Sequence, residues 1–144
     1  LKDAKRERER IAAEKQAEEQ RIAAKKRDRI AEEKRAEENR IVAEKYAEEY
    51  SHRMQPIKAY NIPTVVPKPK YPSLAIEQQM DGYGLVRFSI TITGDVWEPV
   101  LMEEWPEGFG FGQSAVNAAK KLKYEERGAP IQGVRHKFIF QMAK

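Results

Sequence analysis

The sequence predicts an α+β protein in which a long charged helix precedes a small domain of order α-β-β-α-β. Three observations indicate this. Residues 1–52 are rich in charge and contain no helix breaker, whereas all eight glycines and all eight prolines come later. The last half alternates between strand-like and helix-like patterns. Because 35% of the 144 residues are charged, we expect one modest core in the second half rather than a core throughout.

Residues 10–50 form an internal repeat of four units that each begin with Arg-Ile, and three of these units have eleven residues. Almost every residue is a strong helix former. Opposite charges recur four residues apart, as in Arg40 and Glu44, which stabilises a helix. We therefore predict one continuous helix over about residues 3–52, within a spacer at residues 1–54. At 1.5 Å per residue it would be roughly 75 Å long.

The apolar stripe of this helix is thin, since its large members are only four isoleucines backed by alanine. Eleven-residue steps drift by ~20° around the helix, but the eight-residue step from Ile22 to Ile30 turns by ~80°. A coiled coil needs a sustained stripe. A lone solvated helix therefore fits better than a coiled coil, although both remain open. The four isoleucines are Ile11, Ile22, Ile30 and Ile41.

Residues 55–69 form a proline-rich linker. Proline restricts its own backbone and that of the preceding residue, so we predict an extended, semi-rigid spacer with polyproline II character. Just before it, Tyr46, Tyr50 and Met54 follow one another at four-residue spacing and predict a more adhesive last part of the helix. The linker prolines are Pro56, Pro63, Pro67 and Pro69.

Residues 70–144 carry the pattern of a small domain. Val86, Phe88 and Ile90 alternate with polar residues, which is typical of a half-buried strand, and Pro99 predicts an edge strand or a bulge. The expected result is a three-stranded antiparallel sheet with two helices on one face. The expected elements are a helix over 73–80, strands over 86–92 and 96–102, a helix over 114–124 and a strand over 134–140.

The segment Lys-Tyr-Pro-Ser-Leu-Ala at 70–75 resembles the Tyr-Pro-x-x-Ala signature that opens TonB carboxy-terminal domains. Further residues match the spacing of that family across about 73 residues. The departures are Leu122 in place of tryptophan, Glu126 in place of proline, and Gly84 in place of an apolar strand residue. The further matches are Gly82, Phe88, Gly94, Val96, Pro106, Phe111, Ala115, Ala118, Leu122–Glu125 and Phe138–Phe140.

The resemblance implies a periplasmic energy transducer in siderophore or nutrient uptake. Such proteins are anchored in the inner membrane, so we expect an anchoring segment upstream of this chain. They couple the ExbB–ExbD proton-driven motor to outer-membrane transporters by gripping the transporter's TonB box through strand addition. The binding residues implied here are Lys70, Tyr71 and Pro72, together with Val134, Arg135, His136, Lys137, Phe138, Ile139 and Phe140.

Two other function classes compete with this one. The helical spacer is more like that of TolA, which implies a periplasm-spanning scaffold that binds envelope proteins. An enzyme is disfavoured because the carboxylates at Asp81, Glu103 and Glu104 show no acid–base pattern. His136 alternates in phase with core residues, so we interpret it as packed rather than as a ligand or base.

The composition disfavours several kinds of partner and site. The chain has no cysteine and two histidines, and we predict no cofactor, catalytic residue or metal site. The net charge of +4 is interleaved with acids, which disfavours nucleic acid as a partner. The glycine-rich loop over 106–112 lacks a phosphate-binding pattern. We interpret it as a flexible turn, with an exposed contact through Phe109 and Phe111 as the alternative. Weak homodimerisation through the exposed last strand also remains open.

Overall fold

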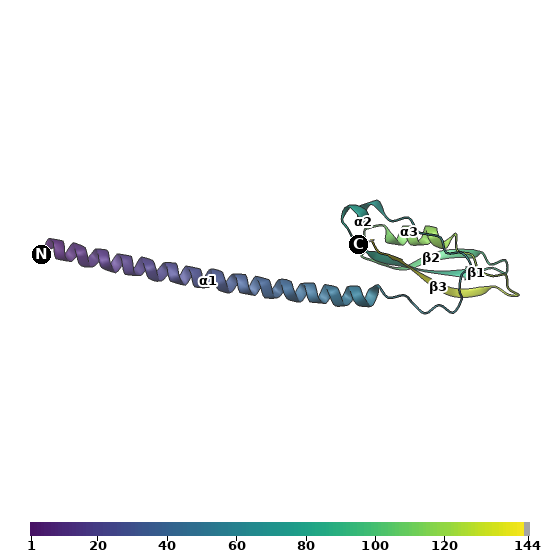
Figure 1. The fold of residues 1–144 in the computed structure, drawn as a ribbon, viewed down its shortest axis with the longest axis horizontal. Coiled ribbons are helices and arrows are strands. Elements are labelled where there is room, and N and C mark those ends of the chain that lie inside the picture. Colours follow the sequence, from purple (N-terminus) through teal and green to yellow (C-terminus); the bar gives the residue numbers. More distant parts are fainter. Residues whose placement is uncertain (143–144) are drawn as a thin grey trace. The chain divides into compact units, whose positions relative to one another are not determined.

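The structure of this protein is a computed structural model, and it describes residues 1–142. The chain forms two compact units, Leu1–Glu49 and the part from Tyr50 onward. Figure 1 follows the elements along the chain. They are α1 (Lys2–Arg53), α2 (Ser73–Glu77), β1 (Gly82–Ile90), β2 (Val96–Trp105), α3 (Phe111–Ala119) and β3 (Ile131–Phe140).

The long helix α1 confirms the prediction from the charged repeat. None of its residues is buried, so its stability comes from helix-forming residues and from ion pairs along its surface. Arg40, for example, lies 2.6 Å from Glu44 one turn later. Ile11 and Ile30 are each about half exposed, at 53% and 51%.

The three strands form one antiparallel sheet, as predicted, and the structure gives their order as β2-β1-β3. The central strand β1 begins at Gly82, earlier than the alternation suggested, and ends at Ile90. Ile92, the last residue of the strand predicted over 86–92, instead lies in the turn and is 55% exposed. Gly94 has φ +84° in this turn, a backbone conformation that glycine adopts without strain.

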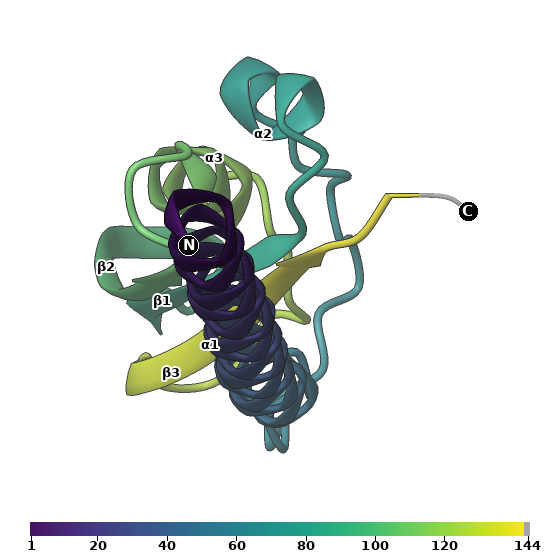
Figure 2. The same cartoon turned by 90° about the vertical axis from the view of Figure 1, so that its left-hand side faces the viewer.

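The core lies between α3 and the sheet. Figure 2 shows α3 over β1 and β2, with α2 on the same side of the sheet, as predicted. The gap between α3 and β1 is narrow, because a Cβ added at Gly84 would lie 2.4 Å from the Cβ of Ala115. A larger apolar side chain at this position would therefore collide with α3. The largest fully buried side chains are Phe111, Ile90, Leu122 and Val86.

The helix predicted over 114–124 is shifted in the structure, where α3 spans Phe111–Ala119. Leu122 and Tyr124 both reach the core from extended backbone. Lys123 between them forms isolated bridges with Val65 and Asp95. The prediction was wrong here because two buried residues two positions apart suit an extended segment better than a helix. The bridge also holds the proline-rich linker against the domain.

Candidate functional site

The free edge of β3 is the first part of the candidate site. β3 pairs with β1 on one side, and within residues 1–142 no strand pairs with its other side. Val134, Phe138 and Phe140 are buried on the core face, whereas Arg135 is exposed. In an antiparallel strand every second residue directs its N–H and C=O away from a given neighbour. The edge therefore presents backbone donors and acceptors that another extended chain could pair with.

Lys137 is more enclosed than an edge-protecting charge would be. Its Nζ donates to the carbonyl oxygen of Gln55 at 2.6 Å and to that of Arg53. It also lies 4.1 Å from the ring centroid of Tyr83. Burial lowers the pKa of Lys137, although the carboxylate of Glu103 opposes this. The side chain thus joins β3 to the end of α1, a role that the sequence pattern did not reveal.

Tyr71 lies at the carboxyl end of β3. Its ring meets that of Phe140 edge-on at 5.7 Å and that of Phe111 at 6.0 Å. Its hydroxyl donates to the carbonyl oxygen of Met80 at 2.5 Å and to Asp81 at 3.2 Å. Burial and the carboxylate of Asp81 raise the pKa of Tyr71 to about 12. The structure therefore places Tyr71 next to β3, although the two are far apart in sequence.

Lys70 and Pro72 flank Tyr71 but lie at the start of α3 instead. The carbonyl oxygen of Lys70 accepts a hydrogen bond from the Ser114 hydroxyl, while the Lys70 side chain is exposed. Pro72 packs so near Gly110 that an added Cβ there would lie 3.3 Å from the proline Cβ. Of the three predicted opening residues, Tyr71 is the one whose ring packs against the last residue of β3.

Asp81 organises this end of the domain. It accepts hydrogen bonds from the Tyr50 hydroxyl at 2.9 Å, from the Tyr71 hydroxyl and from the backbone N–H of Met142 at 3.0 Å. It thereby ties the end of α1, the segment before α2 and the second residue after β3 to one carboxylate. Asp81 shows no acid–base pattern in the sequence, and in the structure it joins three segments of the domain.

Glu103 and Glu104 likewise have structural partners. Glu103 lies 2.7 Å from both Arg53 and the Tyr83 hydroxyl, and these hydrogen bonds lower its pKa although partial burial opposes them. Glu104 accepts a hydrogen bond of 2.7 Å from the backbone N–H of Gly112, where the positive end of the α3 dipole favours a carboxylate.

The end of α1 covers part of the sheet face opposite α3. Met54 is 8% exposed, and Tyr50 lies 6.2 Å from Trp105, measured between ring centroids. The four-residue spacing of Tyr50 and Met54 was the sequence signal for a contact. It could not identify the surface that these residues meet.

His136 lies on the core-facing side of β3, in phase with its buried neighbours. Its ring centroid is 4.5 Å from that of Phe138, and burial lowers its pKa. This packing agrees with the interpretation of His136 as a structural residue.

The glycine-rich loop supplies a core residue. Phe111 is fully buried, and Phe109 packs partly buried against the same cluster, 6.4 Å away between ring centroids. The alternative of an exposed contact through Phe111 was therefore wrong.

Among the described residues, no group of three or more His, Cys, Asp or Glu side chains has a metal-binding arrangement. No helix in residues 1–142 has the combined length and hydrophobicity needed to cross a membrane.

Comparisons with known proteins address the whole domain. Residues 67–142 match the family described as Gram-negative bacterial TonB protein C-terminal. The TonB2 protein of Vibrio anguillarum is 25% identical, with 60% of this chain and 86% of that chain covered and a TM-score of 0.48. The TonB C-terminal domain of Pseudomonas aeruginosa is also 25% identical, with 60% and 91% covered and a TM-score of 0.47. A search of curated proteins found no match. Because the family match spans more than half of the 144 residues, the chain belongs to the TonB C-terminal family.

Proposed function

We propose that this chain grips an extended segment of an outer-membrane transporter, the TonB box, by adding it as a strand to the free edge of β3. Membership of the TonB family implies a non-enzymatic, periplasmic role in energy transduction, with contacts to outer-membrane transporters and an inner-membrane motor. The finer proposal is that the force originates in an ExbB–ExbD motor and reaches this domain through a chain anchored in the inner membrane.

The observation that carries the proposal is that the outer edge of β3 has no partner strand within residues 1–142. From Ile131 to Phe140 the strand contains no proline, so each residue keeps its backbone N–H. Strand addition relies on main-chain hydrogen bonds and tolerates varied side chains. Several such bonds in parallel would also share a pulling load. The proposed binding residues are those of Val134–Phe140, with Tyr71 at the carboxyl end of the strand and Lys70 and Pro72 beside it.

An amide-shift titration of the full 144-residue chain with TonB-box peptides from several outer-membrane transporters tests this proposal. We expect the largest shifts on Val134–Phe140 and around Tyr71. A peptide of the same composition in scrambled order serves as the control. A folded sample that shows no shifts with any peptide would contradict strand addition. It would favour a TolA-like scaffold, the candidate supported by the 52-residue charged helix α1.

A further inference from the structure

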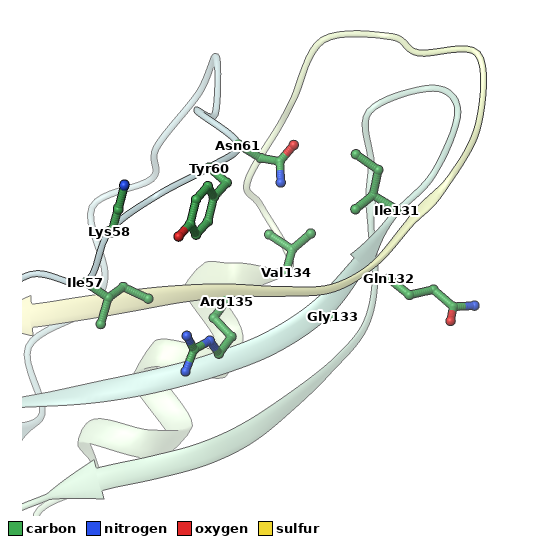
Figure 3. A pocket seen from close by; sticks show the side chains of 9 residues that line it. All are labelled: Ile57, Lys58, Tyr60, Asn61, Ile131, Gln132, Gly133, Val134 and Arg135. Carbon is green, nitrogen blue, oxygen red and sulfur yellow. The ribbon is translucent and has the colours of Figure 1, made fainter.

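The proline-rich linker contributes a wall to a groove beside β3. Residues 57–61 pass along the first half of the strand and enclose a cavity of ≈ 200 Å³ against it. Figure 3 shows Tyr60 and Asn61 on the linker side, with Val134 and Arg135 on the strand side. The lining residues are Ile57, Lys58, Tyr60, Asn61 and Ile131–Arg135.

The linker wall is held at both ends. Before it, Lys137 donates to the carbonyl oxygen of Gln55. At its last residue, the guanidinium of Arg127 lies 3.4 Å from the side-chain oxygen of Asn61. Three residues further on, the Thr64 N–H donates to the Lys123 carbonyl oxygen at 2.7 Å. Within the described part of the chain, no backbone hydrogen bond joins residues 57–61 to β3. Residues 57–61 therefore lie beside β3 without taking up the backbone hydrogen-bonding groups of its edge.

The groove is large enough for a side chain. A cavity of about 150 Å³ in another protein holds a benzene molecule, and this one measures ≈ 200 Å³. Ile57 and Val134 give it an apolar floor, and Tyr60 stands at its rim with 82% of its surface exposed.

The charged side chains that line the groove are all positive. Lys58 and Arg135 line it, and none of the nine lining residues carries a carboxylate. Both cations are exposed, so they can pair with an incoming anion without first being desolvated. The complementary occupant is an extended segment that carries an acidic side chain beside an apolar one.

We propose that residues 57–61 form a second wall of the peptide site, opposite β3, and that Lys58 and Tyr60 contact side chains of the segment paired with β3. This inference rests on the proposed function, because it assigns specificity to the same groove. The backbone edge of β3 would provide affinity for any extended segment, whereas the linker wall would select segments with an acidic residue.

Matched substitutions in the full-length chain test the charge. The probe is a TonB-box peptide that contains Asp or Glu, compared with the same peptide bearing Asn or Gln instead, both with amidated carboxyl ends. We expect Lys58→Gln to weaken binding of the acidic peptide about two- to fivefold, the range of an exposed ion pair, and to leave the amide peptide unchanged. Lys68→Gln is the control, because Lys68 is an exposed linker lysine outside the groove.

The aromatic rim is tested in the same way. Tyr60→Ala should weaken both peptides, whereas Ile62→Ala should weaken neither, since Ile62 is equally exposed at 80% and does not line the groove. Amide shifts at residues 57–61 should accompany those on β3.

Each outcome separates this inference from the proposed function. Shifts on β3 with unchanged affinity in both Lys58→Gln and Tyr60→Ala would overturn the second wall and leave strand addition intact. Sharp, coil-like signals for residues 57–61 on binding, with tighter binding in Tyr60→Ala, would show that the linker is displaced, and would also overturn it. The absence of shifts on β3 with every peptide would refute the proposed function itself.

Discussion

The sheet has two outer strands, and they differ in what they offer to another chain. β2 contains Pro99, which has no N–H to donate, and Glu98 with φ +51° at an irregularity of the pairing with β1. β3 contains no proline, and its pairing with β1 runs unbroken from Gly82–Phe140 to Phe88–Val134. Both strands pair with β1 in the same antiparallel manner.

The difference shows that two edges of one sheet are protected by different means. Proline and bulges disrupt an edge so that it cannot template a further strand. β2 also exposes apolar side chains, including Trp97 at 60% and Val100 at 56%, yet its backbone is a poor template. β3 has an irregularity near its start, where Gly133 has φ +71°, but it keeps a regular backbone from Val134 to Phe140. It limits unwanted pairing through Arg135 and the neighbouring linker. Hence β3 is the edge suited to controlled strand addition.

The largest expected effect is a loss of stability from a change in β1, because both edge strands pair with it. Gly84→Ala places a methyl group 2.4 Å from the Cβ of Ala115, so we expect a loss of about 1–3 kcal/mol in the free energy of unfolding. Tryptophan fluorescence in urea measures this, since both tryptophans lie in the domain. Gly128→Ala, with nothing within 4 Å of the added Cβ, should stay within about 0.5 kcal/mol. Equal losses in the two variants would contradict the close approach of α3.

The second prediction separates the two edges through the peptide. In strand addition, the backbone N–H groups of alternate peptide residues donate to β3, and those of the residues between them point to solvent. Methylation of a donating backbone nitrogen removes a hydrogen bond and adds bulk, so affinity should fall about tenfold or more at every second position. Calorimetric titration with singly N-methylated peptides measures this. A uniform effect along the peptide would mean that it does not bind as a strand on β3.

The third prediction distinguishes two cations of β3. Lys137→Gln removes the charged hydrogen bonds to the carbonyl oxygens of Arg53 and Gln55, so we expect a loss of about 1 kcal/mol in unfolding free energy, less than for a fully buried charged bond. Arg135→Gln should change stability by less than about 0.5 kcal/mol, because Arg135 is exposed. Urea denaturation of both variants checks this. Similar losses would show that Lys137 is no more structural than its neighbour.

The smallest effect concerns pH. Burial lowers the pKa of His136 in the folded state, so the unfolded chain binds a proton first as the pH falls. The stability is therefore full above the unfolded pKa of about 6.5 and declines as the pH falls through the folded value. His136→Gln should flatten the decline in unfolding free energy between pH 7 and 5. An unchanged slope in this variant would contradict burial of His136.

Much of the architecture could be predicted from local patterns. Continuous helix formers and paired charges are enough to specify α1, and the alternation of Val86, Phe88 and Ile90 indicated β1. Pro99 correctly marked β2 as an edge strand with a bulge. Prediction failed at the end of α3, where Leu122 continues the apolar helix face of Ala115 and Ala118 in the sequence but lies in an extended segment. The core and the bridge at Lys123 place it there, and neither is visible locally.

Some features of the candidate site also follow from the sequence, whereas others require the tertiary structure. The sequence by itself determined that residues 134–140 form a strand with cations on one face and that a tyrosine precedes the first short helix, because these follow from residue type and spacing. Only the tertiary structure decided that Tyr71 packs on Phe140, that Lys137 joins the end of α1, and that residues 57–61 line the edge of β3. These contacts link residues about 70–85 positions apart, where spacing along the chain carries no information about distance in space.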